Sequence, residues 1–273
     1  MRNFIGQNNF TWFIGVVEDI NDPVQLGRVR VRCYGWHTDD KGQIPTEALP
    51  WAMPVNPVTS ASVSGVGETP TGLVQGSWVI GFFIDGEKAQ EPAILGSLAG
   101  LPINLPNGKI GFNDPDENFP REGYVTSGDN PVPDTNKLAR GTQTKGYTPD
   151  TDINEVPDPY NAQYPYNHVM ETVSGHVKEY DDTPNHERIR ERHTSGTFYQ
   201  INTHGVKTTH IVANNYTVIA ENDSLHVKGN VTIIVDKNVN LNVKGNFSAT
   251  IGGTCSISSQ GNMSFSAPRI DLN

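Results

Sequence analysis

The chain has 273 residues and carries 20 Lys and Arg against 30 Asp and Glu, which gives a formal net charge of −10. This acidic balance argues against a general nucleic-acid binder. A transmembrane helix needs about 18 consecutive apolar residues, and the sequence has no apolar run of that length. Two cysteines exclude a disulfide framework, and the low charged content of 18% with 27 Gly and 19 Pro favours turn-rich β-structure over a helical enzyme.

Residues 1–101 are predicted to form one small β-domain. An apolar strand is expected at 12–18, and over 27–33 apolar and basic residues alternate strictly, which is typical of a half-buried strand. Mostly apolar segments at 74–86 and 92–98 add further strands. About five short strands without helical periodicity predict a closed barrel such as an OB-fold.

The middle of the chain changes character twice. Residues 102–166 are rich in Pro, Asn and Gly and lack periodicity, so we interpret them as an extended linker. Residues 167–218 are again predicted to be β-structure, which we call the neck. A turn is expected at 181–185, and strands are expected over 187–192 and 197–203.

An eight-residue repeat covers residues 227–266, and a weaker register extends it upstream to residue 219. The odd positions of each octad are mainly apolar and the even positions are mainly polar, which predicts a short strand. Gly and Asn recur at the third and fourth positions, where we expect a bend that these residues favour. The predicted octad bends are Gly229, Gly245, Gly253 and Gly261.

The period predicts how the octads are buried. Eight extended residues span at most about 28 Å, which is too short for one chain to circle a packed core. Three intertwined chains would close a triangular prism, so residues 219–266 are predicted to form a trimeric triple-stranded β-helix, with residues 267–273 as a tip segment. Single-chain β-helices with six- or nine-residue repeats do not fit a period of eight. The side chains predicted to face the trimer core are Val227, Val231, Ile233, Val235, Val239, Leu241, Val243, Phe247, Ile251, Cys255, Ile257, Met263 and Phe265.

Two groups of segments carry a resemblance to a known family. Those at 12–19, 22–32, 44–51 and 111–121 resemble the N-terminal OB domain of the central spike proteins of contractile phage tails, the tail-lysozyme spikes of T-even-type phages. Those at 171–176, 181–184, 187–190 and 193–197 resemble the neck that leads into the triple-stranded β-helix of that family. Type VI secretion spikes of the valine-glycine-repeat family share this neck.

The resemblance implies a homotrimeric spike that docks through its OB domains to a baseplate hub protein. It also implies a PAAR-type tip protein at the C-terminal end and transient contact with the host outer membrane. The expected location is the tail baseplate of the virion, after assembly in the host bacterial cytoplasm. T-even-type members carry a lysozyme domain between barrel and rod, whereas this chain has only the linker there. We therefore expect a structural protein and no enzyme, cofactor or metal.

Other interpretations of the same residues stay open at this point. A type VI-like secretion spike would be mechanically similar, and a trimeric glycan-binding tail fibre would also use a β-prism. Arg28, Arg30 and Arg32 could contact phosphates, although we interpret them as a solvated or subunit-facing strand face and expect no nucleic-acid partner. Asp181 and Asp182 could form an acidic pair, but their Thr-Pro context favours a turn.

Overall fold

The structure is a computed structural model that describes residues 10–101, 107–114, 116, 133–143, 146–149, 152 and 160–271. Parts of the predicted barrel domain, linker and tip segment lie outside the described residues. The regular elements that are described are strands and two short 3₁₀ helices, η1 (Thr46–Ala48) and η2 (Gly86–Lys88). The prediction of an all-β protein is therefore confirmed. None of the helices in this part of the chain is long and apolar enough to cross a membrane.

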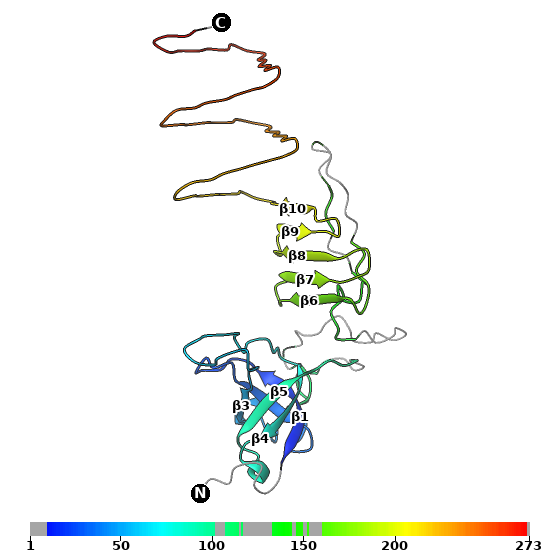
Figure 1. Ribbon diagram of the computed structural model, residues 1–273. Coiled ribbons are helices and arrows are strands. Elements are labelled where there is room, and N and C mark those ends of the chain that lie inside the picture. Colours follow the sequence, from blue (N-terminus) through cyan, green and yellow to red (C-terminus); the bar gives the residue numbers. More distant parts are fainter. Residues whose placement is uncertain are drawn as a thin grey trace. The chain divides into compact units, whose positions relative to one another are not determined.

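Five strands close a barrel near the N-terminus (Figure 1). They are β1 (Trp12–Asp19), β2 (Val29–Cys33), β3 (Trp51–Pro54), β4 (Trp78–Phe83) and β5 (Pro92–Leu98), in the order β1-β2-β3-β5-β4. Closure follows because β1 pairs antiparallel with both β2 and β4, while β3 and β5 pair in parallel. The predicted OB-type barrel is thus confirmed.

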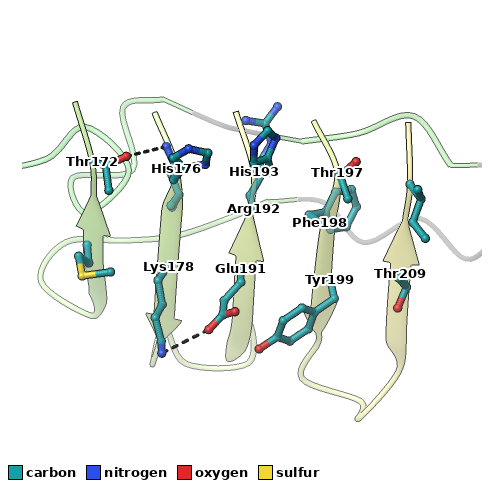
Figure 2. Close-up of a pocket in the computed structure, with 13 residues that line it drawn as sticks. Thr172, His176, Lys178, Glu191, Arg192, His193, Thr197, Phe198, Tyr199 and Thr209 are labelled. Carbon is teal, nitrogen blue, oxygen red and sulfur yellow. Dashed lines mark hydrogen bonds and ion pairs between the residues drawn. The ribbon is translucent and has the colours of Figure 1, made fainter. Parts of the chain in front are cut away.

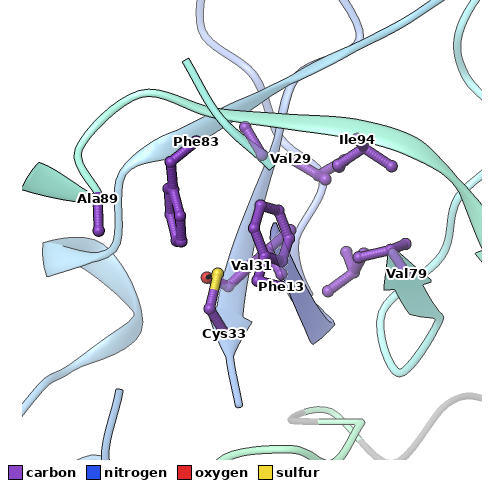
Figure 3. Close-up of a cluster of buried hydrophobic side chains, with 10 residues drawn as sticks. Phe13, Val29, Val31, Cys33, Val79, Phe83, Ala89 and Ile94 are labelled. Atoms are coloured by element: carbon purple, nitrogen blue, oxygen red, sulfur yellow. Dashed lines mark hydrogen bonds between the residues drawn. The ribbon is translucent and has the colours of Figure 1, made fainter. Parts of the chain in front are cut away.

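The barrel core is built from the alternating apolar faces of these strands. Figure 3 shows Phe13, Val31, Cys33 and Phe83 pointing into one cluster, each at most 2% exposed. Burial raises the pKa of the Cys33 thiol to about 12, so this cysteine is an inert apolar filler. At Gly81 of β4, a Cβ would overlap the neighbouring β5 backbone, which explains glycine within this strand.

The basic face of β2 is not solvated. Arg32 is fully buried, with its Nε 2.6 Å from Glu18 Oε1 and its Nη2 3.1 Å from Glu18 Oε2. Its Nη1 and Nη2 also donate to the carbonyls of Thr38 and Ile44, respectively, each at 2.7 Å. The interpretation of this face as solvated or subunit-facing is therefore wrong for Arg32. A buried guanidinium persists here because a carboxylate and two backbone carbonyls accept four hydrogen bonds from it.

Arg28, which directly precedes β2, and Arg30 of β2 also have partners within the chain. Arg28 Nη2 lies 2.7 Å from Asp22 Oδ1, and this contact holds the pKa of the Asp22 carboxyl well below its usual range. The Arg30 guanidinium lies 4.5 Å above the Trp51 ring and donates to backbone carbonyls near η1. No row of free guanidinium groups is left along β2 for phosphates.

The neck is a second sheet, formed by β6 (Asn167–Glu171), β7 (Val177–Asp181), β8 (Arg188–Arg192), β9 (Phe198–Ile201) and β10 (Lys207–His210). The strands are all antiparallel and lie in sequence order, so each one pairs with the next along the chain. Figure 1 shows them stacked like rungs. The predicted strands at 187–192 and 197–203 correspond to β8 and β9. The pairing between successive strands of the neck is thus formed within one chain.

One described part of the predicted linker packs on the barrel. The Gly111 N–H donates to the Asp39 carbonyl at 2.7 Å, and Lys41 Nζ donates to the Gly108 carbonyl at 3.2 Å. A Cβ at Gly111 would overlap the Arg32 side chain, so this segment covers the buried ion pair directly.

A second part of the predicted linker covers the neck. The Tyr160 hydroxyl hydrogen-bonds Glu179, and the Arg188 guanidinium lies 4.4 Å above the Tyr160 ring. The Asn167 side chain donates to the Leu138 carbonyl at 3.3 Å, and Leu138 is fully buried. These segments are structural cover for the two sheets, in addition to any connecting role.

Candidate functional site

Beyond β10, the chain bends at a constant interval of eight residues. Bends lie at 212–213, 220–221, 228–229, 236–237, 244–245, 252–253 and 260–261, with another at residue 268. The glycines predicted as octad bends, Gly229, Gly245, Gly253 and Gly261, are the second residues of four of them. The geometric repeat therefore starts upstream of the clear sequence repeat. We call residues 211–271 the octad coil.

Nothing within one chain explains why glycine occupies these bends. None of the four glycines has a positive φ, and a Cβ placed on any of them would meet no atom within 4 Å. The equivalent bend at Asp236 and Lys237 forms without glycine. Within the single chain, neither a positive φ nor a close neighbour accounts for the recurrence of glycine, and its role at the bends stays a prediction.

The octad coil buries none of the side chains that the sequence assigns to a core. Every residue from 211 to 271 is exposed in the single chain, and the predicted core residues range from 44% exposed at Val243 to 81% at Ile233. Cys255 is exposed as well. Contiguous exposure of this many large apolar side chains is typical of an interaction surface.

The backbone of the octad coil is also unpaired. Between residues 211 and 271 the structure assigns no strand, and no backbone hydrogen bond joins two residues of this described stretch. Figure 1 shows the chain running as an open winding path after β10, without a neighbouring strand. Extended backbone with unpaired donors and acceptors on both sides is a template for pairing with another chain.

The neck has one covered and one open face. The covered face holds a polar core in which Glu179, Asp181, Arg188 and Arg190 are buried. Burial, together with the hydrogen bond to Glu179, raises the pKa of the Tyr160 hydroxyl far above its ordinary value. Burial also lowers the pKa of the Arg190 guanidinium. This network ties the cover segment to the sheet.

The open face of the neck carries mixed apolar and charged residues. Tyr180 and Ile189 are cross-strand partners that remain 47% and 40% exposed. Beside them, Lys178 Nζ lies 3.2 Å from Glu191 Oε1, and Figure 2 shows this pair crossing from β7 to β8. An open depression of about 560 Å³ lies on this face, and Ile211 is one of its lining residues. The open face therefore continues into the start of the octad coil.

The barrel also exposes an aromatic group. The Trp78 and Phe112 rings are stacked with centroids 6.4 Å apart, and Tyr34 contacts Phe112 edge-on at 5.5 Å. Tyr34 is 69% exposed and Trp78 is 39% exposed. Such a patch is typical of a protein-protein contact.

The two carboxylates of the candidate acidic pair, Asp181 and Asp182, have different environments and separate partners. Asp181 is buried, accepts the Thr183 hydroxyl at 2.5 Å and lies 3.4 Å from Arg188. Its neighbour Asp182 is exposed and lies 3.6 Å from His168. Among the described residues, no three His, Cys, Asp or Glu side chains are grouped so that they could hold a metal ion.

Sequence reasoning did not identify the open face of the neck. Its residues come from five strands and are joined only by register, so no local motif marks them. The signal that could have found it is alternation: Lys178 and Tyr180 face one side of β7, while Val177 and Glu179 face the other.

Comparisons with known proteins give consistent results. The family model described as the Gp5 N-terminal OB domain matches residues 35–192, which is more than half of the chain. Protein Gp5 of Vibrio phage KVP40 is 36% identical over 270 residues, covering 82% of this chain and 63% of the relative. The pre-baseplate central spike protein Gp5 of Enterobacteria phage T4 is 46% identical over 119 residues, covering 42% of this chain and 20% of the relative. The chain thus spans less than two thirds of either relative.

Proposed function

The chain belongs to the Gp5 N-terminal OB domain family, and we propose that it is the central spike of a contractile phage tail baseplate. In this proposal three copies form a rod that is driven through the host outer membrane when the tail contracts. The location is the tail baseplate of the virion, after assembly in the host cytoplasm. Both named relatives are phage proteins, which favours a phage tail over a type VI-like secretion apparatus or a glycan-binding fibre.

The observation that carries the proposal is the octad coil. A stretch of about sixty residues bends every eight residues, exposes its apolar side chains and leaves its backbone unpaired. A second and a third copy would supply both missing partners at once, because each octad would form one wall of a three-sided layer. The trimer would also explain why glycine recurs at the bends, since the backbone of a neighbouring chain could approach a glycine closely.

A closed rod of three chains would be stiff, as a mechanical function requires. Each layer would rise by about 4.8 Å, the spacing between paired strands, so hydrogen bonds would run along the rod. Apolar side chains at positions such as Val235, Val239 and Leu241 would interdigitate inside. A shaft held by pairing in one direction and by packing in the other resists bending and compression, which piercing requires.

Two regions of the chain, the barrel surface and the segment after the last octad, suggest two partners. The exposed aromatic group around Trp78 and Phe112, with Tyr34, offers a docking surface for a baseplate hub protein. At the other end, the octad pattern stops near Pro268, and the ion pair between Arg269 and Asp271 at 2.9 Å follows. We assign this end as the platform for a PAAR-type tip protein.

A structural rather than an enzymatic role fits the use of the carboxylates. The Asp181 carboxylate contacts Thr183 and Arg188, and the Glu179 carboxylate accepts a hydrogen bond from Tyr160. These contacts hold the neck together. Neither of these two carboxylates faces the open depression, and the Glu191 carboxylate that does line it is paired with Lys178 at 3.2 Å. We infer a structural role that needs no cofactor or nucleic acid.

The decisive experiment is a mass measurement of the full chain by light scattering, combined with one charge substitution. The wild type should have three times the chain mass of 29.9 kDa. Val239→Asp should prevent formation of an SDS-resistant trimer, because it removes about 1.5–3 kcal/mol of burial per chain and places unpaired carboxylates in a dry core. Asn240→Asp adds the same charge at the next position, which faces outward, and should leave the trimer intact.

Two results would contradict the proposal. A monodisperse wild-type monomer would remove the rod altogether. Equal loss of trimer in both variants would show that added charge matters regardless of the face, and the inward assignment of Val239 would fail.

A further inference from the structure

We propose that the neck sets the register of the three chains, so that its open face aligns them before the octads close. This inference rests on the trimeric spike proposed above. It assigns to β6–β10 a role that the octad coil cannot perform for itself, with a second and third copy of the same neck as the binding partners.

In the proposed trimer, a shift of one octad coil along the other two by eight residues would change few of the contacts between the chains. Val227, Val235 and Val243 are spaced by eight residues, and so are the bends on either side of them. If one chain moved by eight residues, valine would still meet valine and bend would meet bend. Only the contacts of the last octad would be lost. A repeating interface of this kind specifies association well and alignment poorly.

The neck does not repeat. Along the open face, successive cross-strand pairs are Tyr180 with Ile189 and Lys178 with Glu191, followed by the histidines His176 and His193, whose rings are 4.5 Å apart. Each row has its own size and charge, so a displaced copy would oppose unlike residues. The Lys178–Glu191 pair is neutral as a unit, and three copies can therefore approach without strong repulsion.

The order of folding also favours this role. The neck forms its sheet and its buried polar network within one chain, whereas the octad coil has no intrachain backbone pairing among its described residues. The neck can thus be folded while the coil is still open. Because Ile211 both lines the open face and begins the first octad, alignment of three necks would place three coil starts at one level.

The test disrupts the open face and leaves the covered core intact. In the full chain, Tyr180→Glu is combined with Ile189→Glu, and a second variant carries serine at both positions to avoid added charge. His204→Glu in the exposed β9–β10 turn is the matched control. Each protein is assembled, its mass is measured by light scattering, and it is digested briefly with a nonspecific protease before mass spectrometry.

The wild type and the His204→Glu control should be trimers with a single protected C-terminal boundary. Both open-face variants should also be trimers, but with a ladder of protected ends separated by eight residues, because slipped chains leave whole octads unpaired. The charged variant should show the larger slipped fraction.

Three outcomes decide against the inference. A single boundary in both open-face variants would mean that register is set elsewhere. Variants that stay monomeric would mean that the neck drives association and not alignment. A ladder in the wild type would mean that the neck sets no register although the trimer exists. A monomeric wild type would instead overturn the proposed function itself.

Discussion

Replacing Glu18 by glutamine should strongly destabilise the barrel. Glu18 and Arg32 are both fully buried, and their contacts of 2.6 and 3.1 Å form a bidentate pair. The Thr46 hydroxyl adds a third hydrogen bond to the same carboxylate, at 2.8 Å. The variant would leave the Arg32 charge buried with only carbonyl acceptors, and removal of one partner of such a pair costs about 3–5 kcal/mol.

The barrel offers its own reporter for this measurement. All four tryptophans of the chain lie within residues 12–78, so tryptophan fluorescence during urea unfolding follows the barrel alone. Glu47→Gln makes the same chemical change on the exposed η1 and should alter the free energy of unfolding by less than about 0.5 kcal/mol. A loss of under 1 kcal/mol for Glu18→Gln would refute the reasoning, because the charge would then be compensated by something other than Glu18.

Three further predictions test contacts of the barrel and the neck. Burial lowers the pKa of His37 below its ordinary 6.5, so as the pH falls the unfolded chain takes up the proton before the folded chain does. The free energy of unfolding of the barrel should therefore be full above pH 6.5 and fall below it. His37→Gln should flatten this pH dependence in urea titrations. Gly111→Ala should cost about 1–3 kcal/mol by overlap with Arg32, whereas Gly72→Ala, in open space, should be neutral by the same fluorescence assay. Tyr160→Phe should remove one of the two hydrogen bonds to the buried Glu179 carboxylate, the other coming from Asn167 at 2.9 Å. The change should cost about 1–3 kcal/mol and speed hydrogen exchange in the neck strands; unchanged exchange would argue against a role in holding the sheet.

The barrel was readily predicted from the sequence because its strands alternate. The expected strand at 92–98 coincides with β5, and the strand at 12–18 ends one residue before β1 does. β3 was not predicted from the sequence, because a strand of only four residues that ends in proline gives no clear alternating pattern. The buried state of Arg32 could not be predicted either, since its partners come from β1, from two loops and from the segment around Gly111.

The linker shows why composition is a weak guide to packing. A stretch rich in Pro, Asn and Gly lacks the apolar area to fold alone, and that inference is sound for an isolated segment. Here Leu138 and Tyr160 supply single anchors that insert against a preformed sheet. A few such anchors are invisible to any measure averaged over sixty residues.

The octad coil presents the opposite case. Its repeat is clear in the sequence, but the partners that we propose for its apolar side chains are on other copies of the chain. Exposure in the single chain is uneven across each octad. Val235 and Val243, at the first position, are 47% and 44% exposed, whereas Ile233 and Leu241, at the seventh position, are 81% and 72% exposed. The single chain therefore leaves these seventh-position side chains more open to water than these first-position ones. If three chains close the prism, the seventh positions gain the most burial from their neighbours. The stability of the rod would then depend chiefly on residues that the isolated chain leaves in water.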